Sequence, residues 1–131
     1  LEACLPLNGH DLSPQITPLE AGLGNFVSFA KKEDFIGRSF LENFQPRRTS
    51  VAFVMKESGP PPRQHYEVFS GEQKIGEVTS GGVSPTLQKG IGMALVDCQY
   101  AAVDSEIFIE IRGRKIPAVI YPKPLYRRKS T

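Results

Sequence analysis

The sequence is poor in the residues that mark disulfide-rich, metal-binding and membrane proteins. It has no tryptophan, two histidines and two cysteines among 131 residues. Cys4 and Cys98 are too few for a disulfide framework and show no zinc-ligand spacing, so we expect free thiols and no metal. Free thiols favour a cytoplasmic location. No run approaches the ~20 consecutive apolar residues of a membrane-spanning helix, so no membrane partner is expected.

The start of the chain also lacks familiar signals. It opens at Leu1, with no initiating Met, no charged region and no apolar signal-peptide core. We therefore expect a piece of a longer protein. Hydrophobic residues make up 40% and charged residues 23%, which is ordinary for a single folded unit. Twelve glycines and 11 prolines favour a turn-rich, mainly β architecture over a helix bundle.

Acidic residues are absent from the C-terminal end. Residues 1–110 hold all 14 acids and nine bases, whereas seven bases and no acid follow from Arg112 onward. This basic tail is either a solvated chain end or a site for an anionic partner. Tyr126, Arg127 and Arg128 could clamp a planar anion. The net charge of only +2 argues against nucleic acid as that partner.

Residues 1–46 differ in pattern from the rest. Proline and glycine recur every few residues up to Gly24, which excludes a long helix there. The alternation over 25–29 predicts a strand. From Phe35 to Phe44 the apolar spacing predicts a short helix that Pro46 stops, with an apolar face that needs cover. Since proline and the bases that follow it favour an exposed connection, we place a boundary between residues 46 and 47.

Beyond the boundary, strand patterns dominate. Six segments rich in β-branched or alternating apolar residues predict a small antiparallel barrel or jelly roll over residues 50–123. They are Val51–Lys56, Tyr66–Phe69, Lys74–Thr79, Ile91–Val96, Glu106–Ile111 and Lys115–Tyr121. Glycine at 71 and 113 suits two hairpin turns. Pro117 cannot donate to a ladder, which predicts an edge or a bulge.

Two clusters of polar residues are candidate reactive sites. Thr79–Thr86 combines glycines and hydroxyls and could bind an anion through backbone N–H groups, or form a bulged inter-strand turn. It lacks the Gly-Lys-Ser/Thr and helix of a phosphate loop. His10-Asp11 could be an acid/base pair, but the other carboxylates are scattered along the sequence. The residues alone therefore indicate a small β-barrel and no reaction.

A resemblance to a known protein family adds to what the residues indicate. In order along the chain, it is carried by six blocks: Leu1–Ala3, Leu5–Asp11, Thr17–Gly24, Asp34–Arg38, Thr79–Leu87 and Lys123–Tyr126. Together they closely resemble the C-terminal third of the glycine cleavage system T-protein family, which are aminomethyltransferases. The resemblance implies that residues 1–46 end the folate-binding region as a short mixed α/β segment. Residues 47–131 would form the C-terminal β-barrel domain, six-stranded and antiparallel, with the basic tail.

The resemblance also implies a reaction. Such an enzyme transfers a methylene carbon from the aminomethyl group on the lipoylated H-protein to tetrahydrofolate, its substrate, and releases ammonia. The catalytic acid would lie upstream, so this chain alone is expected to be inactive. Contacts with folate are implied for Asn8, where most relatives carry tyrosine, and for Tyr126, Arg127 and Arg128. Glu20 and Arg38 are expected to tie the N-terminal part to the barrel.

Two alternatives stay open. The first is a folate-binding relative that acts on dimethylglycine or sarcosine, or in RNA modification, since a barrel alone hardly separates these activities. The second is a non-catalytic interaction module whose basic tail binds an acidic protein.

Overall fold

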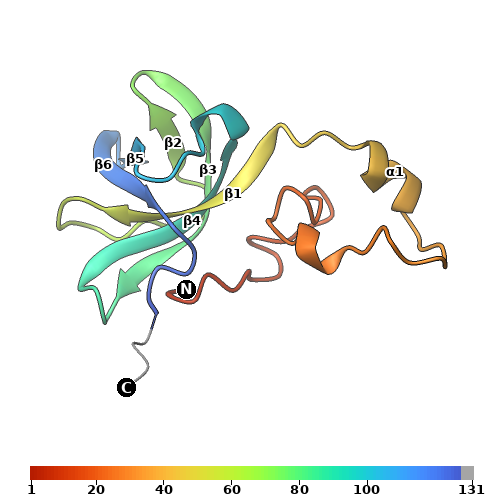
Figure 1. Ribbon diagram of the computed structural model, residues 1–131. Helices are drawn as coiled ribbons and strands as arrows, with labels where there is room; N and C mark the ends of the chain where they lie inside the picture. Colours follow the sequence, from red (N-terminus) through yellow and green to blue (C-terminus); the bar gives the residue numbers. More distant parts are fainter. Residues whose placement is uncertain (128–131) are drawn as a thin grey trace.

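The computed structural model describes residues 1–127, and its centre is a closed barrel of six antiparallel strands (Figure 1). The strands are β1 Arg48–Met55, β2 Glu67–Ser70, β3 Gln73–Ser84, β4 Lys89–Asp97, β5 Glu106–Ile111 and β6 Arg114–Tyr121. Their order around the barrel is β1-β4-β3-β2-β5-β6, and β6 pairs back with β1. The mainly β, six-stranded fold predicted from the sequence is therefore confirmed.

Alternation along the strands builds the core. Val51, Phe53 and Met55 point inward from β1, as their spacing predicts, and join one cluster with apolar residues of the other strands. Gly92 of β4 faces the Phe53 ring, and a Cβ there would lie 2.4 Å from a ring carbon. The ring therefore fits only because position 92 has no side chain.

A second, smaller cluster covers the outside of the barrel. It joins Ala52 and Val54 of β1 with Ile91 of β4 and Leu125 of the chain end, and Cys4 packs against it. Because Ala52 and Val54 alternate with the core residues of β1, they lie on its opposite face. The two ends of the chain thus meet over the same outer surface of β1 and β4.

The predicted hairpins are present. Ser70 and Gln73 pair across the β2–β3 turn, where Gly71 has φ +59°. In the β5–β6 turn both Arg112 (φ +52°) and Gly113 (φ +77°) are left-handed, as a primed turn requires. Pro117 pairs with Phe108 of β5 and lies just beyond the last β1–β6 pair at Ala118.

Three local predictions were wrong. β3 does not end at Thr79 but continues to Ser84, so the glycine and hydroxyl segment is strand rather than an inter-strand loop, although it does contain a bulge. Residues 25–29 form no strand: Gly24–Phe26 is a short 3-10 helix (η1), and the Phe26 side chain is 85% exposed, since no neighbouring strand covers it. The predicted helix is shorter, spanning Arg38–Asn43 (α1).

Outside the barrel, the chain has two different parts. Residues 1–23, here called the N-terminal segment, run beside the barrel, whereas residues 24–47, the arm, reach away from it and carry η1 and α1 (Figure 1). A second 3-10 helix, η2 at Cys98–Tyr100, follows β4. The arm rejoins the barrel where β1 begins at Arg48. The domain boundary between residues 46 and 47 stays a prediction.

Candidate functional site

The Asp11 carboxylate joins the N-terminal segment to β3. Asp11 is 5% exposed. Its Oδ1 accepts a hydrogen bond from the Thr79 hydroxyl at 2.5 Å, and its Oδ2 accepts from the Ser80 hydroxyl at 2.7 Å. Oδ2 also accepts from the backbone N–H of Leu7 at 2.9 Å. A buried carboxylate requires such donors, and here all three are present.

A bulge in β3 makes this arrangement possible. Val78 pairs with Ala94 and Ser80 pairs with Met93, so Thr79 has no partner in β4. In a regular strand, consecutive side chains point to opposite faces. The extra residue cancels that alternation, and the hydroxyls of Thr79 and Ser80 both reach Asp11 outside the barrel.

Asp11 also closes a tight turn over residues 7–12. The Leu7 carbonyl accepts from the N–H groups of His10, Asp11 and Leu12 at 2.9–3.2 Å, and Gly9 donates to the Leu12 carbonyl at 2.8 Å. Gly9 has φ +84°, a conformation that glycine adopts without strain. Asn8 is exposed at this turn.

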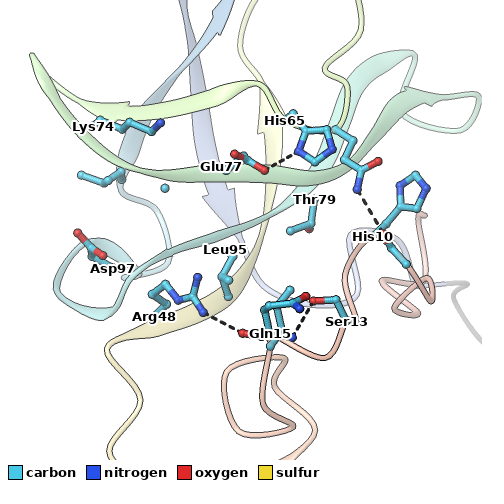
Figure 2. Close-up of a pocket in the computed structure, with 15 residues that line it drawn as sticks. His10, Ser13, Gln15, Arg48, His65, Lys74, Glu77, Thr79, Leu95 and Asp97 are labelled. Atoms are coloured by element: carbon cyan, nitrogen blue, oxygen red, sulfur yellow. Dashed lines mark hydrogen bonds and ion pairs between the residues drawn. The ribbon is translucent and has the colours of Figure 1, made fainter.

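The turn forms one wall of a polar groove of about 630 Å³ (Figure 2). Gly9, His10 and Ser13 lie on one side, and Glu77 and Thr79 of β3 lie on the other. The remaining lining residues include His65, Lys74, Arg48 and Asp97. His65 Nδ1 lies 2.7 Å from a Glu77 oxygen, and the Gln64 amide donates to the Gly9 carbonyl at 3.5 Å. The groove can therefore bind a polar ligand through charges of both signs.

Glu20 provides a second link between the N-terminal segment and the barrel. Its side chain is 6% exposed; one oxygen accepts from Arg48 Nε at 3.0 Å, and the other from the Thr17 N–H at 2.9 Å. Burial raises the pKa of Glu20, but the hydrogen bonds from Thr17 and Arg48 together outweigh it, so the pKa lies below its ordinary value of 4.5. The Ser50 N–H also donates to the Glu20 carbonyl at 2.8 Å.

The expectation for Arg38 was wrong, since among residues 1–127 its guanidinium bonds only to groups of the arm. It reaches the carbonyls of Phe29, Lys31 and Glu33 and the carboxylate of Glu42. Arg38 therefore stabilises the fold of the arm itself. Of the two residues expected to tie the N-terminal part to the barrel, the structure assigns that role to Glu20 alone.

Glu2 forms a third link, beside the end of the chain. Its carboxylate accepts from the Ser84 hydroxyl and from the N–H and hydroxyl of Thr86, both at 3.1 Å. These bonds, led by the one from Ser84, lower the pKa of Glu2 below its ordinary value of 4.5. The Tyr126 N–H donates to the Glu2 carbonyl at 3.2 Å.

The residues with predicted folate contacts lie at two places. Asn8 is in the 7–12 turn, whereas Tyr126, 43% exposed, lies beside Glu2 and is followed by the exposed Arg127. Arg128 lies outside the described residues. Within residues 1–127, no hydrogen bond or ion pair joins Asn8 to Tyr126 or Arg127. Their role in binding stays a prediction.

The described residues also bear on metal binding, disulfides and membrane spans. Across residues 1–127, no three His, Cys, Asp or Glu side chains gather as a metal would require. Cys4 and Cys98 are free thiols. Over that same range, no helix is both long and apolar enough to cross a membrane.

Sequence reasoning missed the link between the two clusters that it weighed separately. Asp11 and Thr79 are 68 residues apart, and Glu2 and Ser84 are 82 apart. Local patterns carry no information on such pairings. The one signal available was the unusual density of hydroxyls in Thr79–Thr86, which are the donors to Asp11 and Glu2.

Comparison with known proteins gives consistent matches. The family model described as the glycine cleavage T-protein C-terminal barrel domain matches residues 48–127. Curated aminomethyltransferases from Bacillus cereus (strain B4264) and Bacillus thuringiensis subsp. konkukian (strain 97-27) are 53% identical over 97% of this chain and 35% of their own length. A crystal structure of glycine cleavage system aminomethyltransferase T from Bartonella henselae superposes with a TM-score of 0.86 at 34% identity, covering 95% of this chain and 36% of that one. The chain thus spans about a third of the length of these relatives.

Proposed function

Because this chain belongs to the glycine cleavage T-protein family of aminomethyltransferases, we propose that it is the C-terminal barrel portion of a tetrahydrofolate-dependent aminomethyltransferase. The observation that supports this most is the 53% identity over 97% of the chain. In the proposed reaction, N5 of tetrahydrofolate attacks the methylene carbon of the aminomethyl group on the lipoyl arm of the H-protein. Over the whole reaction N5 and N10 each form a bond to this carbon, while its bonds to the amino nitrogen and to the lipoyl sulfur break. The protons lost from N5 and N10 go to the leaving nitrogen and to the sulfur, so ammonia, methylenetetrahydrofolate and dihydrolipoyl protein are formed.

The chain's own contribution is to position groups rather than to react. The buried carboxylates of Asp11 and Glu20 accept hydrogen bonds from hydroxyl, N–H and guanidinium groups. Carboxylates engaged in this way support structure and orientation, which is a large part of catalysis in a two-substrate reaction. The catalytic acid is proposed to lie in the upstream part of the enzyme, so the isolated chain would be inactive.

Arg127, exposed near the C-terminus, is the proposed contact with the anionic tail of folate. Arg127 is exposed and follows Tyr126, whose backbone is held by Glu2. A guanidinium pairs well with the carboxylates of a folate glutamate. Because exposed ion pairs contribute about 1 kcal/mol, Arg127→Ala should weaken polyglutamyl folate binding only roughly fivefold. Asn8 and Arg128 complete the proposed contacts.

The proposed partner is the lipoylated H-protein, and the proposed compartment is the cytoplasm, or the mitochondrial matrix in a eukaryote. No nucleic acid or metal is required by the reaction. A titration of the chain with the carrier at low and high salt tests the interaction, because an electrostatically steered contact weakens strongly as salt rises.

The decisive experiment is a hybrid enzyme in which this chain replaces the matching third of the Bacillus cereus aminomethyltransferase. The assay measures methylenetetrahydrofolate and ammonia from aminomethylated H-protein. The intact enzyme is the positive control, and the same enzyme lacking that third is the negative control. Activity near that of the intact enzyme supports the proposal. A hybrid that folds, as judged by circular dichroism, but is no more active than the truncated enzyme contradicts it.

A further inference from the structure

The 7–12 turn has few bonds that fix its direction relative to the barrel. The backbone bonds to the Leu7 and Leu12 carbonyls lie within the turn itself, so they fix its shape but not its orientation. Two side chains link the turn to other elements. Gln64 donates to the Gly9 carbonyl at a long 3.5 Å, while Asp11 accepts short bonds from Thr79 and Ser80.

The Asp11 contacts are the stronger of these links. The carboxylate is buried, and bonds to ionised acceptors away from water are about twice as strong as neutral ones. Its third bond, to the Leu7 N–H, ties the carboxylate to the first residue of the turn. One side chain therefore connects the turn to the bulge of β3.

The 7–12 turn also shapes the groove. Gly9 and His10 line it opposite Thr79, and Asn8 is exposed beside them. A displacement of about 1 Å in a wall of a binding site is enough to reduce function up to a hundredfold. Groups behind a site that hold such walls in place are therefore part of its function.

We propose that Asp11 is a positioning residue for folate binding: by joining the β3 bulge to the 7–12 turn, it holds the turn that carries Asn8 and that places Gly9 and His10 in the wall of the groove. This inference rests on the proposed function. Asp11 touches no substrate in this role and acts only through the turn. Thr79 and Ser80 act with it, because their hydroxyls are its donors from the barrel.

The first test measures amide hydrogen exchange in the chain itself, with Asp11→Asn and the double variant Thr79→Val/Ser80→Ala. Both changes break the same link, one from each side. The amides of residues 7–12 should exchange about tenfold faster in both variants, with β5 and β6 unchanged. The control is Glu42→Gln, which removes a carboxylate link to Arg38 within the arm, away from the 7–12 turn.

The second test measures steady-state kinetics in the hybrid enzyme. The KM for tetrahydrofolate should rise about tenfold in Asp11→Asn and in Thr79→Val/Ser80→Ala, with kcat within twofold, since the reacting groups lie elsewhere. Combining the two sets should add little, because they disrupt one connection. Glu42→Gln should leave the KM unchanged.

The outcomes separate the two claims. If the unmodified hybrid is inactive, the proposed function is wrong, and with it any role in folate binding. If the hybrid is active but the KM stays unchanged in Asp11→Asn, or rises equally in Glu42→Gln, the positioning role is wrong while the proposed function stands. A fall in kcat at constant KM also overturns it. Exchange that is unaltered over residues 7–12 shows that Asp11 does not hold the turn.

Discussion

The N-terminal segment and the arm both lie outside the strands of the barrel but differ in their relation to it. Neither contains a strand, and both are interrupted by proline or glycine. Yet residues 1–23 run along the barrel, bound at Glu2, Asp11 and Glu20, whereas the arm projects away (Figure 1). Among the described residues, the hydrogen bonds of the Arg38 side chain all lie within the arm.

The difference shows what holds an irregular segment on a barrel. The N-terminal segment buries little apolar surface, with Ala21 as its one buried hydrophobic residue in the described chain. Its links are carboxylates that meet hydroxyl and N–H donors of the strands. The arm, by contrast, carries large apolar side chains that stay exposed: Phe26, Ile36 and Phe40. Polar links at specific points, rather than hydrophobicity, decide which segment docks.

The largest effect should separate barrel from arm. Phe53 is fully buried at the centre of the core, so Phe53→Ala should lower the free energy of unfolding by about 3–5 kcal/mol through the cavity it leaves. Phe40, on α1, is exposed, and Phe40→Ala should change the free energy of unfolding by less than about 0.5 kcal/mol. Urea denaturation followed by tyrosine fluorescence and circular dichroism measures both. Equal losses would mean that the arm packs as tightly as the barrel.

An intermediate effect should come from the Glu20 link. Glu20→Gln removes the charge that meets Arg48 and leaves either the Arg48 guanidinium or the half-buried Thr17 N–H without an acceptor, which should weaken docking of the N-terminal segment by about 1 kcal/mol. The measurement is hydrogen exchange of the Ala21 and Leu23 amides, which donate within the segment. Glu42→Gln, which breaks the exposed pair with Arg38, is the control and should change little. Unaltered exchange in Glu20→Gln would show that the link contributes nothing to docking.

The barrel could be predicted from the sequence, and the docking could not. Strand positions follow from alternation, as in Val51, Phe53 and Met55, because burial on one face repeats every second residue. The extension of β3 was missed because glycines and hydroxyls read locally as a turn, and only pairing with β4 shows that they continue the strand. The error at residues 25–29 has the same origin, because an alternating segment forms a strand only where a partner strand can pair with it.

The candidate site was still harder to predict. Asp11, Thr79 and Ser80 each stood out by residue type, but the contact between them depends on a bulge and joins positions 68 residues apart in the sequence. The proposed contacts at Asn8, Tyr126 and Arg127 came from resemblance alone. They remain predictions that the hybrid enzyme can test.

A smaller effect should follow from pH. The pKa values of Glu2 and Glu20 lie below the ordinary 4.5, so their ionised forms stabilise the docked state. That contribution is complete above about pH 5 and is lost as the pH falls through the lowered values, because the docked state then takes up protons less readily than the released one. Exchange of residues 1–23 should therefore speed up below about pH 4.5, relative to β4. This acceleration of exchange at low pH should be smaller in the double variant Glu2→Gln/Glu20→Gln. An equal acceleration in that variant would mean that other groups cause the pH dependence.

The smallest effect should lie in the arm and depends on exposure alone. The Ile36 side chain is fully exposed, so Ile36→Ser removes no buried area and should change the free energy of unfolding by less than about 0.5 kcal/mol. Val83→Ser is the matched control, since Val83 is 60% exposed but belongs to β3. Urea midpoints near the unmodified value for both variants would show that exposure, and not the region, sets the cost. A loss above 1 kcal/mol confined to Ile36→Ser would instead mean that the arm is packed in solution, and the contrast with the N-terminal segment would then disappear.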